Sequence, residues 1–285
     1  MSESRKKPRA KALPSEEYIE QAYLFRGLLH RLQSAEPIQE LLGYLREEIL
    51  ATTNLPHAID YLLAELNHVG TMASAMAKME HYFAPFQTYL IREAENERGR
   101  FDMRLALLIL EHEAKMRASG VGPVTTFLFQ FESICRNRLN YDLGLVAMAG
   151  DPVFDDAWSH WILDVRHKIG IVDIADLVFV HSEHYRERQT QIGEPVGDGP
   201  FLFGVKEGRI ALANRGKDNL YFFAALQRQL SYPAAPKPVR KDADADLLPK
   251  LTRMLERMEV RIKLLEAEQR ENGIDLNQFI DRSGE

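Results

Sequence analysis

Apolar residues recur every three or four positions along most of this chain, the spacing of a helix with one buried face. The first such segment begins after Pro14, where Ser15 and two glutamates are typical of a helix start. Its apolar face consists of Tyr18, Ala22, Phe25, Leu28, Leu29 and Leu32. The pattern therefore predicts a helix that packs this face against the rest of the protein.

The same spacing continues through the following segments. It predicts helices at residues 38–49, 56–83, 86–98, 100–118, 124–137, 141–149 and 155–169. Short turns separate these helices, and Gly120–Pro123 is the clearest of them. We interpret residues 14–177 as one helical body built from paired helices.

The pattern changes after Asp176. Leu177–Val180 is a short run of the β type, although it also fits the end of a helix. Farther on, apolar residues at 201–205 and 210–213 flank Glu207–Gly208, an arrangement typical of a β-hairpin. Together with a helix at 220–230, this predicts a small α/β hairpin subdomain over residues 178–230. The predicted fold class is therefore mainly α (α+β).

The remaining residues predict a linker and a coiled-coil helix. Residues 231–246 contain three prolines and mixed charge, which indicates a semi-rigid, Pro-rich linker. Residues 247–272 carry a heptad pattern, and residues 273–285 form a C-terminal tail. The apolar seam of the heptads consists of Leu248, Leu251, Leu255, Met258, Ile262 and Leu265.

This seam favours association between copies of the chain, because a helix of about three heptads is marginally stable alone in water. With Leu248 at position a, Arg261 occupies g and Glu266 the following e, and the two can pair across a parallel interface. The same run from Arg261 to Glu266 also matches a pattern associated with trimers, so the sequence is compatible with a dimer and a trimer. In the alternative interpretation, the helix folds back onto its own body.

Charge argues against a large nucleic-acid-binding face. The 285-residue chain has a net charge of −6, and its hydrophobic (45%) and charged (27%) contents are those of a globular protein. Residues 1–13 contain five basic side chains and one acidic side chain, so they carry +4 and the remainder −10. We predict a disordered basic tail there. Nucleic acid is therefore an unfavoured partner, with the tail as its only candidate contact.

Cysteine content and hydropathy predict the cellular setting. Cys135 is the single cysteine, which excludes an intramolecular disulfide and fits a reducing compartment. The chain has no apolar leader and no apolar run of the length that spans a bilayer. We therefore expect a cytoplasmic protein without a membrane span.

Glu65 and His68 are the candidate metal ligands. At positions i and i+3 of a helix they face the same way, as in ferritin-like di-metal bundles. Such a bundle needs a second Glu-x-x-His motif, which the chain lacks. His181 and His184 flank Glu183 without a further ligand nearby in the sequence. No phosphate loop, dinucleotide fingerprint or nucleophile elbow occurs, so we predict no cofactor and no catalytic residue.

Taken together, these patterns predict a noncatalytic homo-oligomeric scaffold or adaptor. Its helical body would meet an unidentified protein partner, and its coiled coil would join the copies. The first alternative is a ferritin-like di-metal enzyme or sensor that uses Glu65 and His68. The second alternative is a nucleic-acid-associated protein that uses the basic N-terminal tail.

Overall fold

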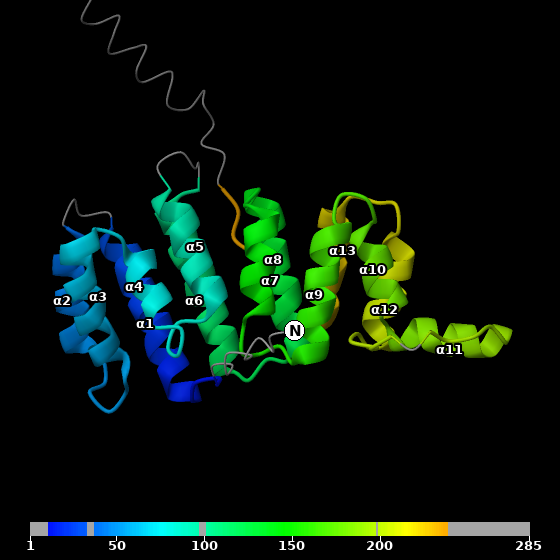
Figure 1. The fold of residues 1–285 in the computed structure, drawn as a ribbon, viewed down its shortest axis with the longest axis horizontal. Coiled ribbons are helices and arrows are strands. Elements are labelled where there is room, and N and C mark those ends of the chain that lie inside the picture. Colours follow the sequence, from blue (N-terminus) through cyan, green and yellow to red (C-terminus); the bar gives the residue numbers. More distant parts are fainter. Residues whose placement is uncertain (1–10, 33–36, 97–100, 198, 239–285) are drawn as a thin grey trace, which may run out of the picture. The chain divides into compact units, whose positions relative to one another are not determined.

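The computed structural model describes residues 11–32, 37–96, 101–197 and 199–238. Within these ranges it contains thirteen helices and two isolated β-bridges, and no strand (Figure 1). The helices are α1 (Ser15–Arg31), α2 (Ile38–Glu48), α3 (Leu55–Val69), α4 (Met72–Lys78), α5 (Pro85–Glu95), α6 (Met103–Ala118), α7 (Pro123–Asn137), α8 (Tyr141–Ala149), α9 (Asp156–Lys168), α10 (Ile174–Val180), α11 (Glu183–Ile192), α12 (Val205–Asn214) and α13 (Asn219–Leu230). The mainly helical part of the predicted fold class is confirmed.

The first helix packs as its apolar pattern predicts. Its buried face includes Leu24, Phe25 and Leu28, and α1 lies along α6, which follows much later in the chain. α1 also contacts α2, and a Cβ atom at Gly27 would lie 2.3 Å from Leu45 Cδ2. A glycine at this position therefore permits the close approach of the two helices.

The long helix predicted over 56–83 is two helices, α3 and α4. The chain turns between them at Gly70, whose φ of 77° is in the left-handed region that glycine adopts without a steric cost. The carboxylate of Glu95 then accepts hydrogen bonds from Met72 N (2.6 Å) and Ala73 N (2.9 Å). These bonds satisfy backbone donors of the first turn of α4, so α5 holds the new helix in place.

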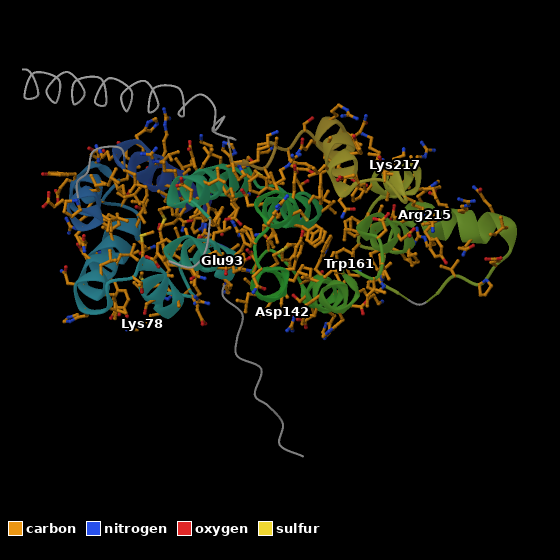
Figure 2. All side chains as sticks on the ribbon, turned by 90° about the horizontal axis from the view of Figure 1, so that it is seen from above. Lys78, Glu93, Asp142, Trp161, Arg215 and Lys217 are labelled. Atoms are coloured by element: carbon orange, nitrogen blue, oxygen red, sulfur yellow. The ribbon has the colours of Figure 1, made fainter. Side chains whose placement is uncertain are left out.

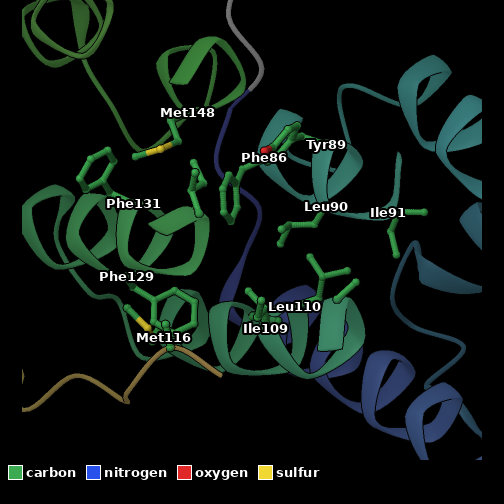
Figure 3. Close-up of a cluster of buried hydrophobic side chains, with 14 of the residues drawn as sticks. Phe86, Tyr89, Leu90, Ile91, Ile109, Leu110, Met116, Phe129, Phe131 and Met148 are labelled. Atoms are coloured by element: carbon green, nitrogen blue, oxygen red, sulfur yellow. The ribbon is translucent and has the colours of Figure 1, made fainter. Parts of the chain in front are cut away.

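The predicted helical pairs at 86–118 and 124–149 are confirmed as α5–α6 and α7–α8. Figure 3 shows how their apolar faces meet in one cluster of buried side chains. Leu90 of α5 lies over Leu110 of α6, and Phe131 of α7 lies near Met148 of α8. Burial of these large side chains is the main source of stability in this part of the fold.

An aromatic cluster joins the later helices. Trp158 and Trp161 of α9 are both buried, as their helical spacing predicts. Their rings meet Phe127 of α7 and Phe203, with centroid separations of 4.9 Å for Phe127–Trp161 and 5.1 Å for Trp161–Phe203. Phe203 precedes α12 in the chain, so this cluster packs the segment before α12 against α9.

The predicted β-hairpin is wrong, because its second half is helical. Residues 205–214 form α12, and the predicted turn residue Gly208 lies inside this helix. A Cβ atom at Gly208 would lie 2.2 Å from Ser182 Oγ, so glycine serves close packing here and makes no turn. Phe203 forms only an isolated bridge with Ser182. Leu177–Val180, the run that also fitted a helix end, completes α10.

The described chain ends against the body. Tyr232 and Ala235 are buried, and Asn137 Nδ2 donates a hydrogen bond to Pro236 O (3.0 Å). The first residues of the predicted Pro-rich linker therefore pack beside the end of α7. Among the described residues, none of the helices combines the length and the apolar composition that crossing a bilayer requires.

Candidate functional site

A groove beside α7 and α8 is the best candidate for a binding site. Phe131 and Cys135 stand four residues apart on α7, so they share one helix face. α8 begins at Tyr141, and its N-terminus is capped by Asn140, whose side chain accepts a hydrogen bond from Leu143 N (3.1 Å). These elements place Tyr141 beside Phe131, with a ring separation of 6.2 Å. Phe131, Cys135 and Tyr141 form one wall of the groove.

The opposite wall is the turn between α9 and α10. Gly170 adopts a φ of 86°, and the backbone amides of Ile171 and Val172 both donate to Lys168 O at 3.0 Å. Asp173 ends the turn: its carboxylate accepts hydrogen bonds from Ala175 N (3.0 Å) and from Gly216 N (2.8 Å). The turn is therefore held both by α10 and by the connection between α12 and α13.

The groove has a volume of about 490 Å³ and a mainly apolar lining. Ile171 stands on its rim with 86% of its surface exposed, the highest value among the exposed large apolar side chains of the described chain. Exposed apolar side chains around a concave surface are typical of a site that binds another molecule.

The groove contains a thiol and a phenol that both hold their protons. Burial raises the pKa of Cys135 to about 12, despite a hydrogen bond from the Tyr141 hydroxyl that acts in the opposite direction. Burial also raises the pKa of Tyr141. Since the thiolate is the nucleophilic form of cysteine, Cys135 is poorly suited to nucleophilic catalysis near neutral pH. The groove thus combines apolar side chains with a protonated thiol and a protonated phenol.

We expect Cys135 to react slowly with iodoacetamide at pH 8. Its thiolate fraction is far smaller than that of an ordinary cysteine, so alkylation should be at least about tenfold slower in the native protein than in urea. The measurement is the rate of mass increase by mass spectrometry. Because Cys135 is the only cysteine, each chain reports on this position alone. Equal alkylation rates in the native and the unfolded protein would contradict the raised pKa of Cys135.

The candidate metal ligands are not grouped with others. Glu65 and His68 lie near the end of α3, and Glu65 Oε2 pairs with Lys78 Nζ of α4 at 2.5 Å. Among residues 11–32, 37–96, 101–197 and 199–238, no group of three or more His, Cys, Asp or Glu side chains is placed to hold a metal ion. The arrangement that a di-metal bundle requires is thus not formed by the described residues.

The other histidine pair occupies the junction of α10 and α11. His181 Nδ1 lies 2.9 Å from Leu177 O, and its ring meets Trp161 at 5.8 Å. The His184 ring meets Phe179 instead, at 6.2 Å. These contacts give both histidines a role in packing.

The predicted oligomerisation residues lie outside the described residues. They are Leu248, Leu251, Leu255, Met258, Arg261, Ile262, Leu265 and Glu266. Most of the predicted basic tail, residues 1–10, is also outside them. The coiled coil and the tail therefore stay predictions.

Sequence reasoning missed a buried ionic cluster next to the main core. Arg117 of α6 pairs with Glu113 (2.8 Å) and with Asp151, which follows α8, and all three side chains are buried. Gln130 of α7 donates to Glu113 Oε1 (2.7 Å) and Asp151 Oδ2 (3.1 Å). Burial alone would lower the pKa of Arg117, but the two carboxylates outweigh that effect and raise it well above its usual value. The only local signal was the four-residue spacing of Glu113 and Arg117.

No protein-family model, curated protein or solved structure matches the chain.

Proposed function

We propose that the chain is a noncatalytic homo-oligomeric scaffold or adaptor whose helical body binds a protein partner. The observation that carries this proposal is the heptad seam from Leu248 to Leu265. The residues that precede the seam in the sequence are anchored to the body up to Pro236. Tyr232 is buried, and the carbonyl oxygen of Pro236 accepts a hydrogen bond from the Asn137 side chain. An oligomer of the seam would tether several copies of the body, and a partner with several sites would bind them with increased avidity.

The groove at α7–α8 supports a binding role for the body. Its exposed Ile171 and its apolar lining suit a protein surface of the same character, and its thiol and phenol are protonated at neutral pH. The most deeply buried charges are engaged internally: Arg117 by Glu113 and Asp151, and Glu132 by Arg136. Arg117–Asp151 joins α6 to the segment after α8, whereas the other two pairs each lie within one helix.

The test is the mass of the protein in solution, measured by light scattering. We expect the full chain to have two or three times the 32.7 kDa mass of one copy. A truncation ending at Ala243 should have the mass of one copy. The double variant Leu255→Asp, Ile262→Asp should also be a monomer, since it places charges at two a positions of the seam. Its circular dichroism should still show a folded helical body.

Val260→Asp with Leu264→Asp is the matched control. These residues occupy positions f and c of the same heptads, which face away from the seam, so the double control variant should keep the mass of the full chain. A full chain that is itself a monomer would overturn the proposal. That result would favour the alternative in which the C-terminal helix folds back onto its own body.

A further inference from the structure

A second cleft lies on the α3–α4 side of the body, remote from the groove at α7–α8. Figure 2 shows Lys78 of α4, which lines this cleft, far from Trp161 of α9. The cleft has a volume of about 520 Å³, a size suited to a small organic molecule. Ala58 and Met79 form apolar parts of its wall. The remaining lining is dominated by hydrogen-bonding side chains.

The cleft brings together two imidazole side chains and one ammonium group from three consecutive segments. His57 comes from the first turn of α3, Lys78 from the last turn of α4, and His81 from the connection to α5. Tyr61 adds a hydroxyl one helical turn after His57. Hydrogen-bond donors from separate elements thus face one space.

The two histidines are uncommitted. Within the described part of the chain, neither the His57 nor the His81 side chain takes part in a hydrogen bond, an ion pair or a ring contact. Lys78 gives one hydrogen bond to Glu65, and an ammonium group has three donors, so two are left. An imidazole has an N–H donor in either charge state. The cleft therefore offers at least four donors to a ligand.

The neighbouring carboxylates are already satisfied by the protein. Glu65 pairs with Lys78 at the edge of the cleft. Glu17 is buried and accepts hydrogen bonds from two lining residues, through Asn54 N (2.7 Å), Asn54 Nδ2 (2.8 Å) and Tyr82 Oη (2.7 Å). No acidic side chain lines the cleft among the described residues. An incoming anion would thus meet donors, and no carboxylate of the lining would oppose it.

We propose that this cleft binds a small organic anion, with an oxyanion group held by His57, His81 and Lys78. The body of the ligand would lie against Ala58, Met79 and the ring of Tyr61. An oxyanion accepts several charge-assisted hydrogen bonds at once, which matches the convergent donors. Phosphate esters and carboxylates share this chemistry, and the experiment separates them.

The experiment follows the histidine side-chain resonances of the full chain by NMR during titration with phenyl phosphate. We expect saturable shifts of the His57 and His81 signals, and weaker binding of phenol, which has the same ring without the oxyanion. Titrations with benzoate and with inorganic phosphate then identify the preferred head group. The double variant His57→Gln, His81→Gln should bind phenyl phosphate at least about tenfold more weakly.

His68→Gln is the matched control, because His68 is exposed on the same helix and does not line the cleft. It should bind phenyl phosphate as the unmodified chain does. The fold of each variant is checked by circular dichroism, and little change is expected since both cleft histidines are exposed. The proposal is overturned if no ligand gives saturable shifts, if phenol binds as tightly as phenyl phosphate, or if the double variant and the control bind equally.

Discussion

Replacing Arg117 with Met should lower the free energy of unfolding by about 3–5 kcal/mol, the cost of removing one partner from a buried ion pair. Arg117 is nearly inaccessible, and its guanidinium donates to Glu113 and to Asp151. Methionine fills much of the same volume but leaves both carboxylates buried without their cation. Among the described residues, Gln130 and the backbone amide of Val153 would then be the donors left to them. Urea unfolding followed by circular dichroism gives the change.

Two further variants separate the charge effect from a packing effect. Arg166→Met removes a cation from an exposed pair with Asp142, and the unfolding midpoint should hardly move, since exposed pairs contribute little. Adding Glu113→Gln and Asp151→Asn to Arg117→Met should restore part of the lost stability, because the stranded charges are then gone. If Arg117→Met unfolds at the same urea concentration as the unmodified chain, the cluster does not hold α6 to the segment after α8.

Gly208→Ala should lower the free energy of unfolding by about 2 kcal/mol, a typical cost of overpacking. The added Cβ would lie 2.2 Å from Ser182 Oγ and 2.7 Å from His184 Cβ. Ser182 is fully buried and caps α11, with its hydroxyl accepting a hydrogen bond from Tyr185 N. The substitution must therefore displace the cap or move α12. Urea unfolding gives the stability, and hydrogen exchange of α11 amides reports the loosened cap.

The same substitution at Gly43 should have the opposite sign. Gly43 lies within α2, and no atom lies within 4 Å of the position that a Cβ would occupy. Alanine there gains helix propensity without a clash, so the protein should become more stable by about 0.5–1 kcal/mol. Equal effects at positions 43 and 208 would show that helix propensity alone governs both, and that Gly208 is not a packing residue.

The pattern of apolar positions predicted most of the helices correctly because it is local. A helix such as α1 buries residues spaced three and four apart, and that spacing is visible without knowledge of the partner helix. Local signals failed where one residue type serves two purposes. Gly70 lies within an uninterrupted apolar pattern yet ends α3, whereas Gly208 looks like a turn residue yet lies inside α12. Whether such a glycine ends a helix or lies inside one depends on its backbone angle and its tertiary contacts. Neither can be inferred from the neighbouring residues in the sequence.

The candidate sites depended still more on the tertiary structure. Cys135 was visible as the lone cysteine, but its neighbour Tyr141 and the exposed Ile171 carried no signal of a groove. His57, Lys78 and His81 have no motif spacing, and they share a cleft only because α3 and α4 fold back on each other. For Glu65, the sequence suggested a metal ligand, and the structure pairs it with Lys78.

By itself, the sequence determined that this chain is mainly helical, where most of its helices lie, and that a heptad seam follows them. These properties depend on residues within a few turns of one another. Only the tertiary structure decided that residues 205–214 are helical, that Arg117 neutralises Glu113 and Asp151, and which polar side chains face a cleft. The physical reason is that burial and pairing depend on residues far apart in the chain, and their energies outweigh local preference.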